Sequence, residues 1–422
     1  MNLYLGIDFG TTGARSTIID SQGTIHCETE HTFANAQQPE LPSAWQNALW
    51  AVIDQIPPAI RNQVRAIALD GTSSTVMLCN TDGIPVCEPI LYNDARGAAV
   101  TERLRAIAPD NHTVLSATSS LAKLLWWQEG GHGDTAPTVF LHQADWLAFL
   151  LHGKLGISDY HNALKLGFDV DTLCYPNWLT QGIAGAATPE LPRVVPPGTP
   201  VGEVRAQVGD RFGFPRDCMI CAGTTDSIAA FLASGVNLPG EAVTSLGSTL
   251  AVKLLSHTRV DDSRYGIYSH KLGDLWLVGG ASNTGGAVLR HFFTDVELDN
   301  YSRQIEPEQE SLLDYYPLLK KGDRFPINDP NLPPRLEPRP TDSVEFLHGL
   351  LESIARIEAR GYQLLQELGA TPLTKVYTAG GGAKNSVWSA IRKRYLKVPV
   401  ETPIHTAAAY GSALLAKHGT LI

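Results

Sequence analysis

Short apolar runs separated by turn residues open the chain and predict strands. Residues 3–8, 14–20 and 25–33 form three such runs, joined by turns rich in glycine, threonine and serine. Apolar residues then recur at helical spacing through 44–55, and residues 64–69 form another apolar run. Three antiparallel strands, a helix and a further strand predict an α/β fold. A nucleotide-binding βαβ fold would not begin with two hairpins.

The second half of the chain repeats this order. Runs at 242–245, 250–255 and 275–279 predict strands, and a helical pattern follows at 285–293. We therefore expect a duplicated domain, with a boundary near 225–240. The predicted division is an N-terminal domain at 1–228 and a C-terminal domain at 229–422, with the last helix, 406–418, packing back at the hinge.

Further helices are predicted at 117–127, 143–151, 344–368, 386–396 and 407–417, whereas 153–200 is rich in glycine and proline and predicts irregular structure. A chain of 422 residues is too long for one ordinary core, which agrees with two or three domains.

Charge and composition exclude some classes of protein. A net charge of −10 argues against a nucleic-acid binder, which needs a basic face. No run of about 18 apolar residues predicts a membrane span, and the N-terminus lacks the pattern of a signal peptide. Six scattered cysteines fit a reducing compartment. We expect a cytoplasmic protein that is a monomer or a small homo-oligomer, with no nucleic-acid or membrane partner.

The first hairpin turn, Asp8–Gly13, is a candidate phosphate site. Its glycines let backbone amides approach an anion closely, and Thr11 and Thr12 add hydroxyl donors. A phosphate held there would place Asp8 near a bound Mg²⁺, which usually keeps several waters. An ordinary hairpin with a polar turn explains the same residues when the motif is taken alone.

Two later segments offer similar chemistry. Residues 245–249 form a second glycine–hydroxyl turn, so that Gly247, Ser248 and Thr249 could grip a phosphate chain from the other side. Residues 379–385 place three glycines between a strand and a helix, where a ribose or base could lie against bare backbone; a flexible loop is the alternative. No GxxxxGK[ST] P-loop occurs.

Asp226 follows a Gly-Thr-Thr turn at the start of a predicted helix. It is either a carboxylate that stabilises the helix N-terminus or a general base that faces a substrate hydroxyl. Ser73 follows an apolar strand and could point into a cleft. Residues 92–96 and 159–162 are polar clusters that could contact a sugar or could simply be solvated loops.

Together these motifs resemble the FGGY carbohydrate kinases of the actin-like ATPase superfamily. The resemblance rests on DFGTTGAR, SLGST, AGGGAKN, the AGTTDS segment and SSLAKLLW, in family order, and covers essentially the whole chain. It implies two RNase H-like domains flanking a catalytic cleft, with ATP and Mg²⁺ on the C-terminal side and a sugar on the N-terminal side.

The resemblance also implies residue roles. Asp226 would be the base and Asp8 the metal-side carboxylate, acting through water. Ser73 would contact the sugar together with both carboxylates. The phosphates and adenosine would be held by Thr11, Thr12, Gly247, Ser248, Thr249, Gly381, Gly382, Asn385 and Trp388.

Within the family the chain looks most like the small D-ribulose kinase group, through ALDGTSSTV, SDYHNALKLG and GGASN. It has Thr72-Ser73-Ser74 where xylulose kinases carry Gln-Met-His, and Tyr92 where the family has tryptophan. We therefore expect phosphorylation of D-ribulose. The alternatives are a D-xylulose or other polyol kinase, a nucleotide-sensing module without sugar transfer, and a filament-forming actin-like protein.

Overall fold

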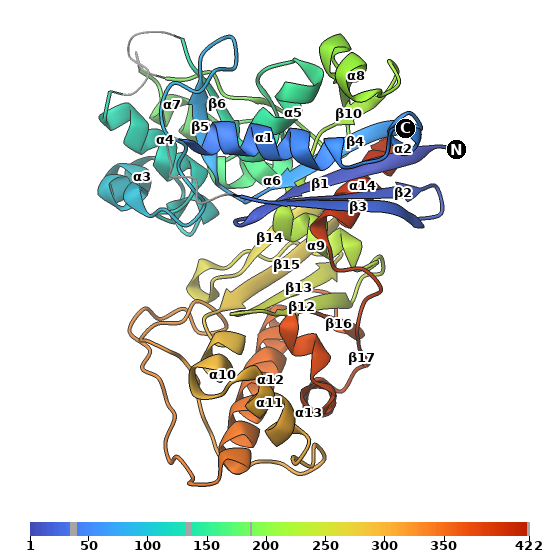
Figure 1. Cartoon of the computed structure of the whole chain (residues 1–422). Helices are drawn as coiled ribbons and strands as arrows, with labels where there is room; N and C mark the ends of the chain where they lie inside the picture. The colour runs from blue at the N-terminus through green and yellow to red at the C-terminus, as the bar shows by residue number, and fades with distance from the viewer. Residues whose placement is uncertain (34–39, 132–136, 186–187, 420–422) are drawn as a thin grey trace. The chain divides into compact units, whose positions relative to one another are not determined.

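The computed structural model describes residues 1–33, 40–131, 137–185 and 188–419 (Figure 1). The chain divides into two compact units. Unit 1 comprises Met1–Ala233 together with Ala407–Ile422, and unit 2 comprises Ser234–Thr406. The last helix, α14 (Ala408–Gly419), therefore belongs with the N-terminal part of the chain.

Unit 1 is built on a mixed sheet. Its strand order is β3 (Ile25–Thr32), β2 (Gly13–Asp20), β1 (Leu3–Phe9), β4 (Val64–Gly71), β10 (Met219–Cys221) and β9 (Pro200–Glu203). The short β11 (Thr224–Thr225) also pairs with β4. β1 is antiparallel to β2 and parallel to β4, so the first hairpin feeds directly into a parallel region. Every residue of β1 is buried, as expected for a central strand.

Helices cover this sheet on both faces because its central strands are apolar on both faces. α1 (Leu41–Asp54) and α5 (Gln143–His152) bury apolar stripes in the core that also contains β1 and β4, whereas Tyr4, Ala66 and Ala68 pack with α14. The remaining helices of unit 1 with more than six residues are α3 (Thr101–Ile107), α4 (Ser120–Glu129), α8 (Ala206–Phe212) and α9 (Asp226–Ala233).

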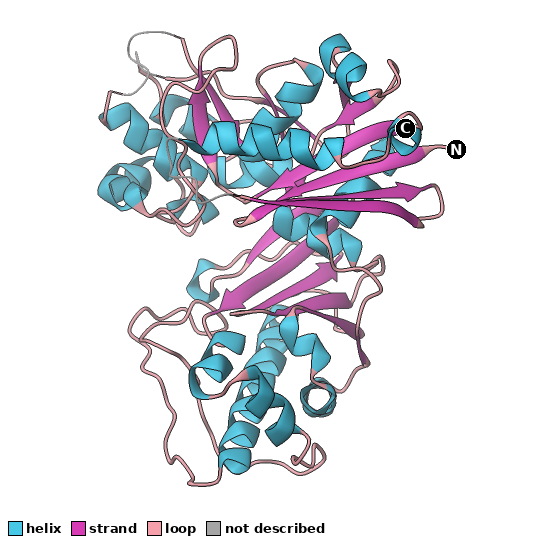
Figure 2. Cartoon of the chain, in the orientation of Figure 1, coloured by secondary structure: helices cyan, strands magenta, loops and turns pink. Residues whose placement is uncertain are grey.

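Unit 2 also contains a sheet with helices (Figure 2), and its central strands pair as those of unit 1 do, as the sequence predicts. Its sheet has the order β14 (Tyr268–Leu272), β15 (Leu275–Ser282), β13 (Leu250–Ser256), β12 (Glu241–Leu246), β16 (Lys375–Ala379) and β17 (Val400–Glu401). β12 is antiparallel to β13 and parallel to β16, just as β1 is to β2 and β4. The predicted α/β class and the duplicated arrangement are confirmed.

The helices of unit 2 are α10 (Gly286–Phe292), α11 (Asp295–Ser302), α12 (Ser343–Glu367) and α13 (Ser386–Leu396). A buried ion pair joins the last two, since Arg392 donates two hydrogen bonds of 2.6 and 2.7 Å to Glu358. Arg392 also donates to Thr378 Oγ1 on β16 at 2.6 Å, so the pair ties both helices to the sheet. Both charged groups find fixed polar partners, which buried ions require.

Some boundaries differ from the sequence predictions. The helix predicted at 117–127 begins at Ser120, because the Ser119 side chain accepts a hydrogen bond from the Ala122 N–H and caps it there. The region 153–200, predicted to be irregular, contains β7 (Ile157–Asp159), α6 (Tyr160–Ala163), α7 (Asn177–Gly182) and β8 (Arg193–Val195). None of the helices within the described ranges combines the length and the apolar character needed to cross a bilayer.

Candidate active site

Three carboxylates lie at the edge where parallel strands of unit 1 end. The β1–β4 register pairs Asp8 with Asp70, and the β4–β11 register pairs Asp70 with Thr224, two residues before Asp226. Residues paired in this way point to the same face of a sheet. The sequence analysis selected Asp8 and Asp226, and the structure brings both to the same edge. Asp70, which lies between them, was missed.

Burial raises the pKa values of two of these carboxylates, Asp70 and Asp8. Asp70 is fully buried, and this burial, together with the charges of Asp8 and Asp226, raises its pKa well above the usual range. Burial also raises the pKa of Asp8, against the opposing effects of a hydrogen bond with Asp70 and the charge of Arg15. Asp70 therefore carries the proton that the two groups share.

The hydrogen bonds around Asp70 agree with a protonated side chain. Ser412 of α14 donates to Asp70 Oδ2 at 2.6 Å. Asp70 Oδ1 is buried and accepts no donor from the rest of the described structure. A proton on Asp70 that bridges to Asp8 satisfies this oxygen and leaves Asp8 as the anion.

Asp226 opens α9 and is more exposed than Asp8 or Asp70. Its Oδ1 accepts the Ser227 N–H at 2.7 Å, which fixes one carboxylate oxygen at the helix start. Gly223, just before β11, lies so close to β4 that an added Cβ would meet Leu69 O at 2.0 Å. This close approach is why glycine precedes the Thr-Thr-Asp segment.

Ser73 lies on the turn that leaves β4 at the same edge. It is the only partly exposed residue of the turn, whose other members, Thr72, Ser74 and Thr75, are buried. The Thr72 and Thr75 hydroxyls are 2.5 Å apart, and the Thr72 N–H donates to Gln143 Oε1 at 3.1 Å. These hydrogen bonds fix the turn to Gln143, and Ser73 remains accessible to a ligand.

All four residues of the polar cluster at 159–162 are buried. Asp159 accepts the backbone N–H groups of His161 and Asn162, and His161 Nδ1 lies 2.7 Å from Thr224 Oγ1 on β11. Burial and the nearby Asp145 raise the pKa of Asp159 to about 7. The cluster is therefore linked to β11 through His161 and Thr224.

In unit 2, three glycine-containing segments pack against one another. We call them the glycine cradle: the turn 246–249, Gly285-Gly286 and the loop 380–382. An added Cβ at Gly285 would lie 2.7 Å from the Thr249 backbone, and one at Gly380 would lie 2.7 Å from Leu246 O. The Gly286 N–H donates to Gly247 O at 2.9 Å. Ser248, Thr249 and Gly381 are exposed on this surface.

Two predicted nucleotide-binding residues have structural roles here. Asn385 caps α13, accepting the Trp388 N–H at 2.9 Å, and its Nδ2 donates to Ser302 at 2.8 Å. Trp388 is buried beneath Gly382, whose added Cβ would meet the indole at 2.7 Å. The sequence analysis also missed Arg290, whose guanidinium lies 3.3 Å from the Cβ position of Gly381 and supplies positive charge beside the cradle.

The donor set at the edge of unit 1 suits Mg²⁺. No group of three or more His, Cys, Asp or Glu side chains gathers as a metal site within the described ranges. Mg²⁺ is commonly bound by one or two carboxylates, with water and phosphate oxygens completing the shell. Asp8, an anion at the strand edge beside the exposed Thr11 and Thr12, fits this coordination.

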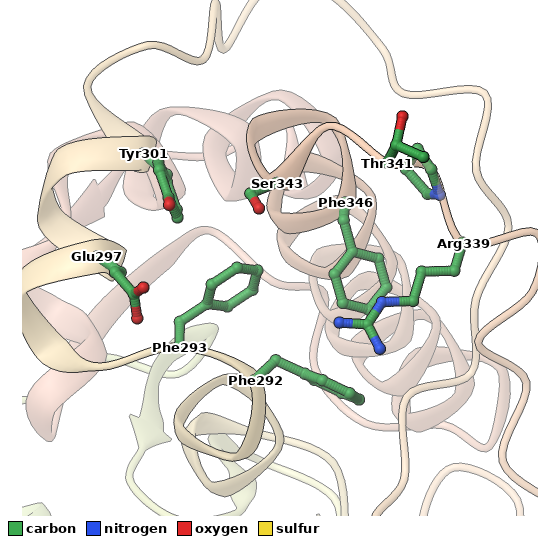
Figure 3. Close-up of a pocket in the computed structure, with 9 residues that line it drawn as sticks. Phe292, Phe293, Glu297, Tyr301, Arg339, Thr341, Ser343 and Phe346 are labelled. Carbon is green, nitrogen blue, oxygen red and sulfur yellow. The ribbon is translucent and has the colours of Figure 1, made fainter.

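A cavity of about 350 Å³ lies elsewhere in unit 2 and contains none of the predicted site residues. Its wall includes Phe292, Phe346 and Arg339, whose guanidinium lies over both rings at 5.0 and 4.6 Å (Figure 3).

Comparison with known families agrees with the two units. Residues 3–233 match the N-terminal domain of the FGGY family of carbohydrate kinases, and residues 242–420 match its C-terminal domain. The chain belongs to the FGGY family of carbohydrate kinases. It is 26% identical to a xylulose kinase of Streptomyces coelicolor over 434 residues, which cover 95% of this chain and 84% of the relative.

Solved structures share the fold of this FGGY kinase. A kinase from Brucella ovis, described as a xyloylose kinase, superposes with a TM-score of 0.87 at 22% identity and covers 99% of this chain and 90% of its own. The glycerol kinase of Plasmodium falciparum with ADP gives a TM-score of 0.84 at 17% identity, covering 100% of this chain and 90% of that one.

Proposed function

We propose that this ATP-dependent sugar kinase phosphorylates a ketopentose, converting D-ribulose to D-ribulose 5-phosphate. The observation that carries the proposal is the convergence of Asp8, Asp70 and Asp226 at one strand edge, beside the turn that presents Ser73. This arrangement supplies a metal-side anion, a partly exposed carboxylate and a partner for a sugar hydroxyl. The glycine cradle supplies the backbone surface and exposed hydroxyls for the nucleotide.

In the proposed reaction, Asp226 accepts the proton of the C5 hydroxyl as that oxygen forms a bond to the γ-phosphorus and the bond to ADP breaks. One carboxylate base and accurate positioning suffice for such a transfer. Asp8 holds Mg²⁺ through water, and the ion would neutralise charge on the phosphates. Thr11, Thr12, Gly247, Ser248 and Thr249 hold the phosphates, and Gly381, Gly382 and Asn385 border the adenosine.

The choice of D-ribulose follows from the turn after β4. The chain has the small hydroxyl residues Thr72-Ser73-Ser74 where, by the family resemblance, xylulose kinases carry Gln-Met-His. The Thr72 hydroxyl is bonded to Thr75 and to Gln143, and the side chain of Ser74 is buried, so Ser73 is the partly exposed hydroxyl of this turn that we assign to the sugar. D-xylulose is the second candidate, because several relatives, including that of S. coelicolor, are described as xylulose kinases.

A coupled assay of ADP release across D-ribulose, D-xylulose, L-ribulose, gluconate and glycerol tests the proposal. We expect the highest kcat/KM with D-ribulose and a 5-phosphate product by NMR. A higher kcat/KM with D-xylulose than with D-ribulose would make D-xylulose the substrate. Nucleotide binding with no sugar-stimulated ADP release would instead indicate a nucleotide-sensing module, and ATP-dependent light scattering would indicate a filament.

A further inference from the structure

A fully buried lysine contacts the backbone of the turn that presents Ser73. Lys123 belongs to α4 and has no exposed surface. Its Nζ donates one hydrogen bond to Ser74 O and another to Leu91 O, each 2.7 Å long. A lysine is rarely buried to this degree unless its amine has fixed partners. Here both partners are backbone carbonyls.

The two carbonyls belong to the two segments that border the site. Ser74 directly follows Ser73 and has a left-handed backbone, with φ of 65°, which is uncommon for a residue other than glycine. Leu91 directly precedes Tyr92, whose side chain is 41% exposed and whose N–H donates to Thr75 Oγ1 at 3.1 Å. The amine therefore joins the Ser73 turn to the segment 91–97.

Helix α4 holds the rest of that segment as well. Arg96 lies over the Trp126 ring at 4.7 Å and makes hydrogen bonds of 3.0 and 2.7 Å to Asp94. Gly97 approaches the start of the helix so closely that an added Cβ would meet Ala122 Cβ at 2.6 Å. The segment is thus fixed at three successive points along one helix face.

We propose that Lys123 is a positioning residue for the sugar: by bridging Ser74 O and Leu91 O, it sets the distance between Ser73 and Tyr92 and hence the fit of the ketose. The proposal rests on the proposed function in taking Ser73 as a sugar contact. It extends that function, because it makes Tyr92 the second wall of the sugar site and names the group that holds the two walls together.

The charge state of Lys123 agrees with a bridging role. A neutral amine has two N–H donors, and the structure provides two carbonyl acceptors. Burial, opposed by the charge of Asp94 and aided by those of Lys165 and Arg96, lowers the pKa of Lys123 to about 7. Both hydrogen bonds can form with or without the additional proton.

The test compares Lys123→Met, which keeps the stem but removes both donors, with Lys123→Gln, whose amide keeps two N–H groups. The matched control is Lys154→Met, since Lys154 also donates to a backbone carbonyl, Val201 O, at 2.6 Å, but at β9. For Lys123→Met we expect the sugar KM to rise roughly 10- to 100-fold, as for small misplacements of bound substrate. The KM for ATP should change less than twofold, Lys123→Gln should recover part of the loss, and the control should match wild type.

A double-mutant cycle with Ser73→Ala separates positioning from general loss of structure. If Lys123 acts through Ser73, the double variant should lose less kcat/KM than the product of the two single losses. Equal increases in both KM values, or independent effects in the cycle, would overturn the inference. If Lys123→Met does not fold, the same comparisons are made with Lys123→Gln. A wild-type enzyme that phosphorylates no sugar would instead contradict the proposed function.

Discussion

At the residue scale, exposure distinguishes the three clustered carboxylates from one another. Asp70 is fully buried and Asp8 nearly so, whereas Asp226 is partly exposed at the start of α9. A base must reach the hydroxyl proton it accepts, so burial argues for Asp226 in this role. Asp70 holds its proton and supports Asp8, because an ionised Asp70 would add a second buried negative charge beside it.

Replacement of Asp226 by asparagine should separate catalysis from binding. The amide keeps the size of the side chain but cannot accept a proton, so we expect kcat to fall by about 10²- to 10⁴-fold. Nucleotide affinity, measured by calorimetry, should remain nearly intact. Asp217→Asn is the matched control, since Asp217 is an exposed carboxylate of the same unit that pairs with Arg65. Wild-type turnover in Asp226→Asn would show that another group accepts the proton.

At the element scale, close backbone contacts hold α14 in place. Gly411 lies against α9, where an added Cβ would meet Ala229 O at 1.8 Å, and Gly6 of β1 would meet Ala409 O at 1.9 Å. The same helix carries Ser412, which donates to Asp70. The C-terminal helix is therefore part of the support for the carboxylates.

The substitution Gly411→Ala tests this contact, because the sign of the change in the free energy of unfolding depends on it. In a helix interior, alanine normally stabilises by up to about 1 kcal/mol relative to glycine. Here the clash with a backbone oxygen should destabilise unit 1 by about 1–3 kcal/mol, as overpacking does. Gly209→Ala in α8 is the control, because its Cβ would meet neighbours at 3.5 Å, an ordinary contact. Urea unfolding of both variants gives the comparison, and equal stabilities would exclude a tight α14 contact.

The elements that the sequence predicted best are those with strong local patterns. Residues 386–396 were predicted as a helix and form α13, because Asn385 provides the cap and apolar residues follow at helical spacing. Asp226 was recognisable from the Gly-Thr-Thr turn before it. Asp70 could not be recognised in this way. It becomes a site residue only when parallel strand pairing places it between Asp8 and Thr224, which are far apart in the chain. Trp388 was assigned to the nucleotide from the family resemblance, and its burial beneath Gly382 is a contact that the sequence does not show.

At the scale of the whole molecule, the candidate residues divide between the two units. Asp8, Ser73 and Asp226 lie in unit 1, whereas the glycine cradle lies in unit 2. In each unit these residues lie near the ends of β1 or β12 and of the strands paired with them. The duplication thus provides two related binding edges. The proposed function assigns the sugar, Mg²⁺ and the phosphate contacts of Thr11 and Thr12 to the first, and the remaining nucleotide contacts to the second.

Hydrogen exchange can test this division without any catalysis. Bound D-ribulose should slow exchange at 71–75 and 91–97 of unit 1, because a ligand that binds only the folded form reduces local opening. Bound ADP should slow exchange at 246–249 and 380–385 of unit 2. Peptides that cover β9 provide the internal reference, since this edge strand carries none of the candidate residues. The contrary result is that the sugar alone protects the glycine cradle and leaves exchange at 71–75 unchanged. That result would place the sugar in unit 2 and contradict the roles given to Ser73 and Asp226.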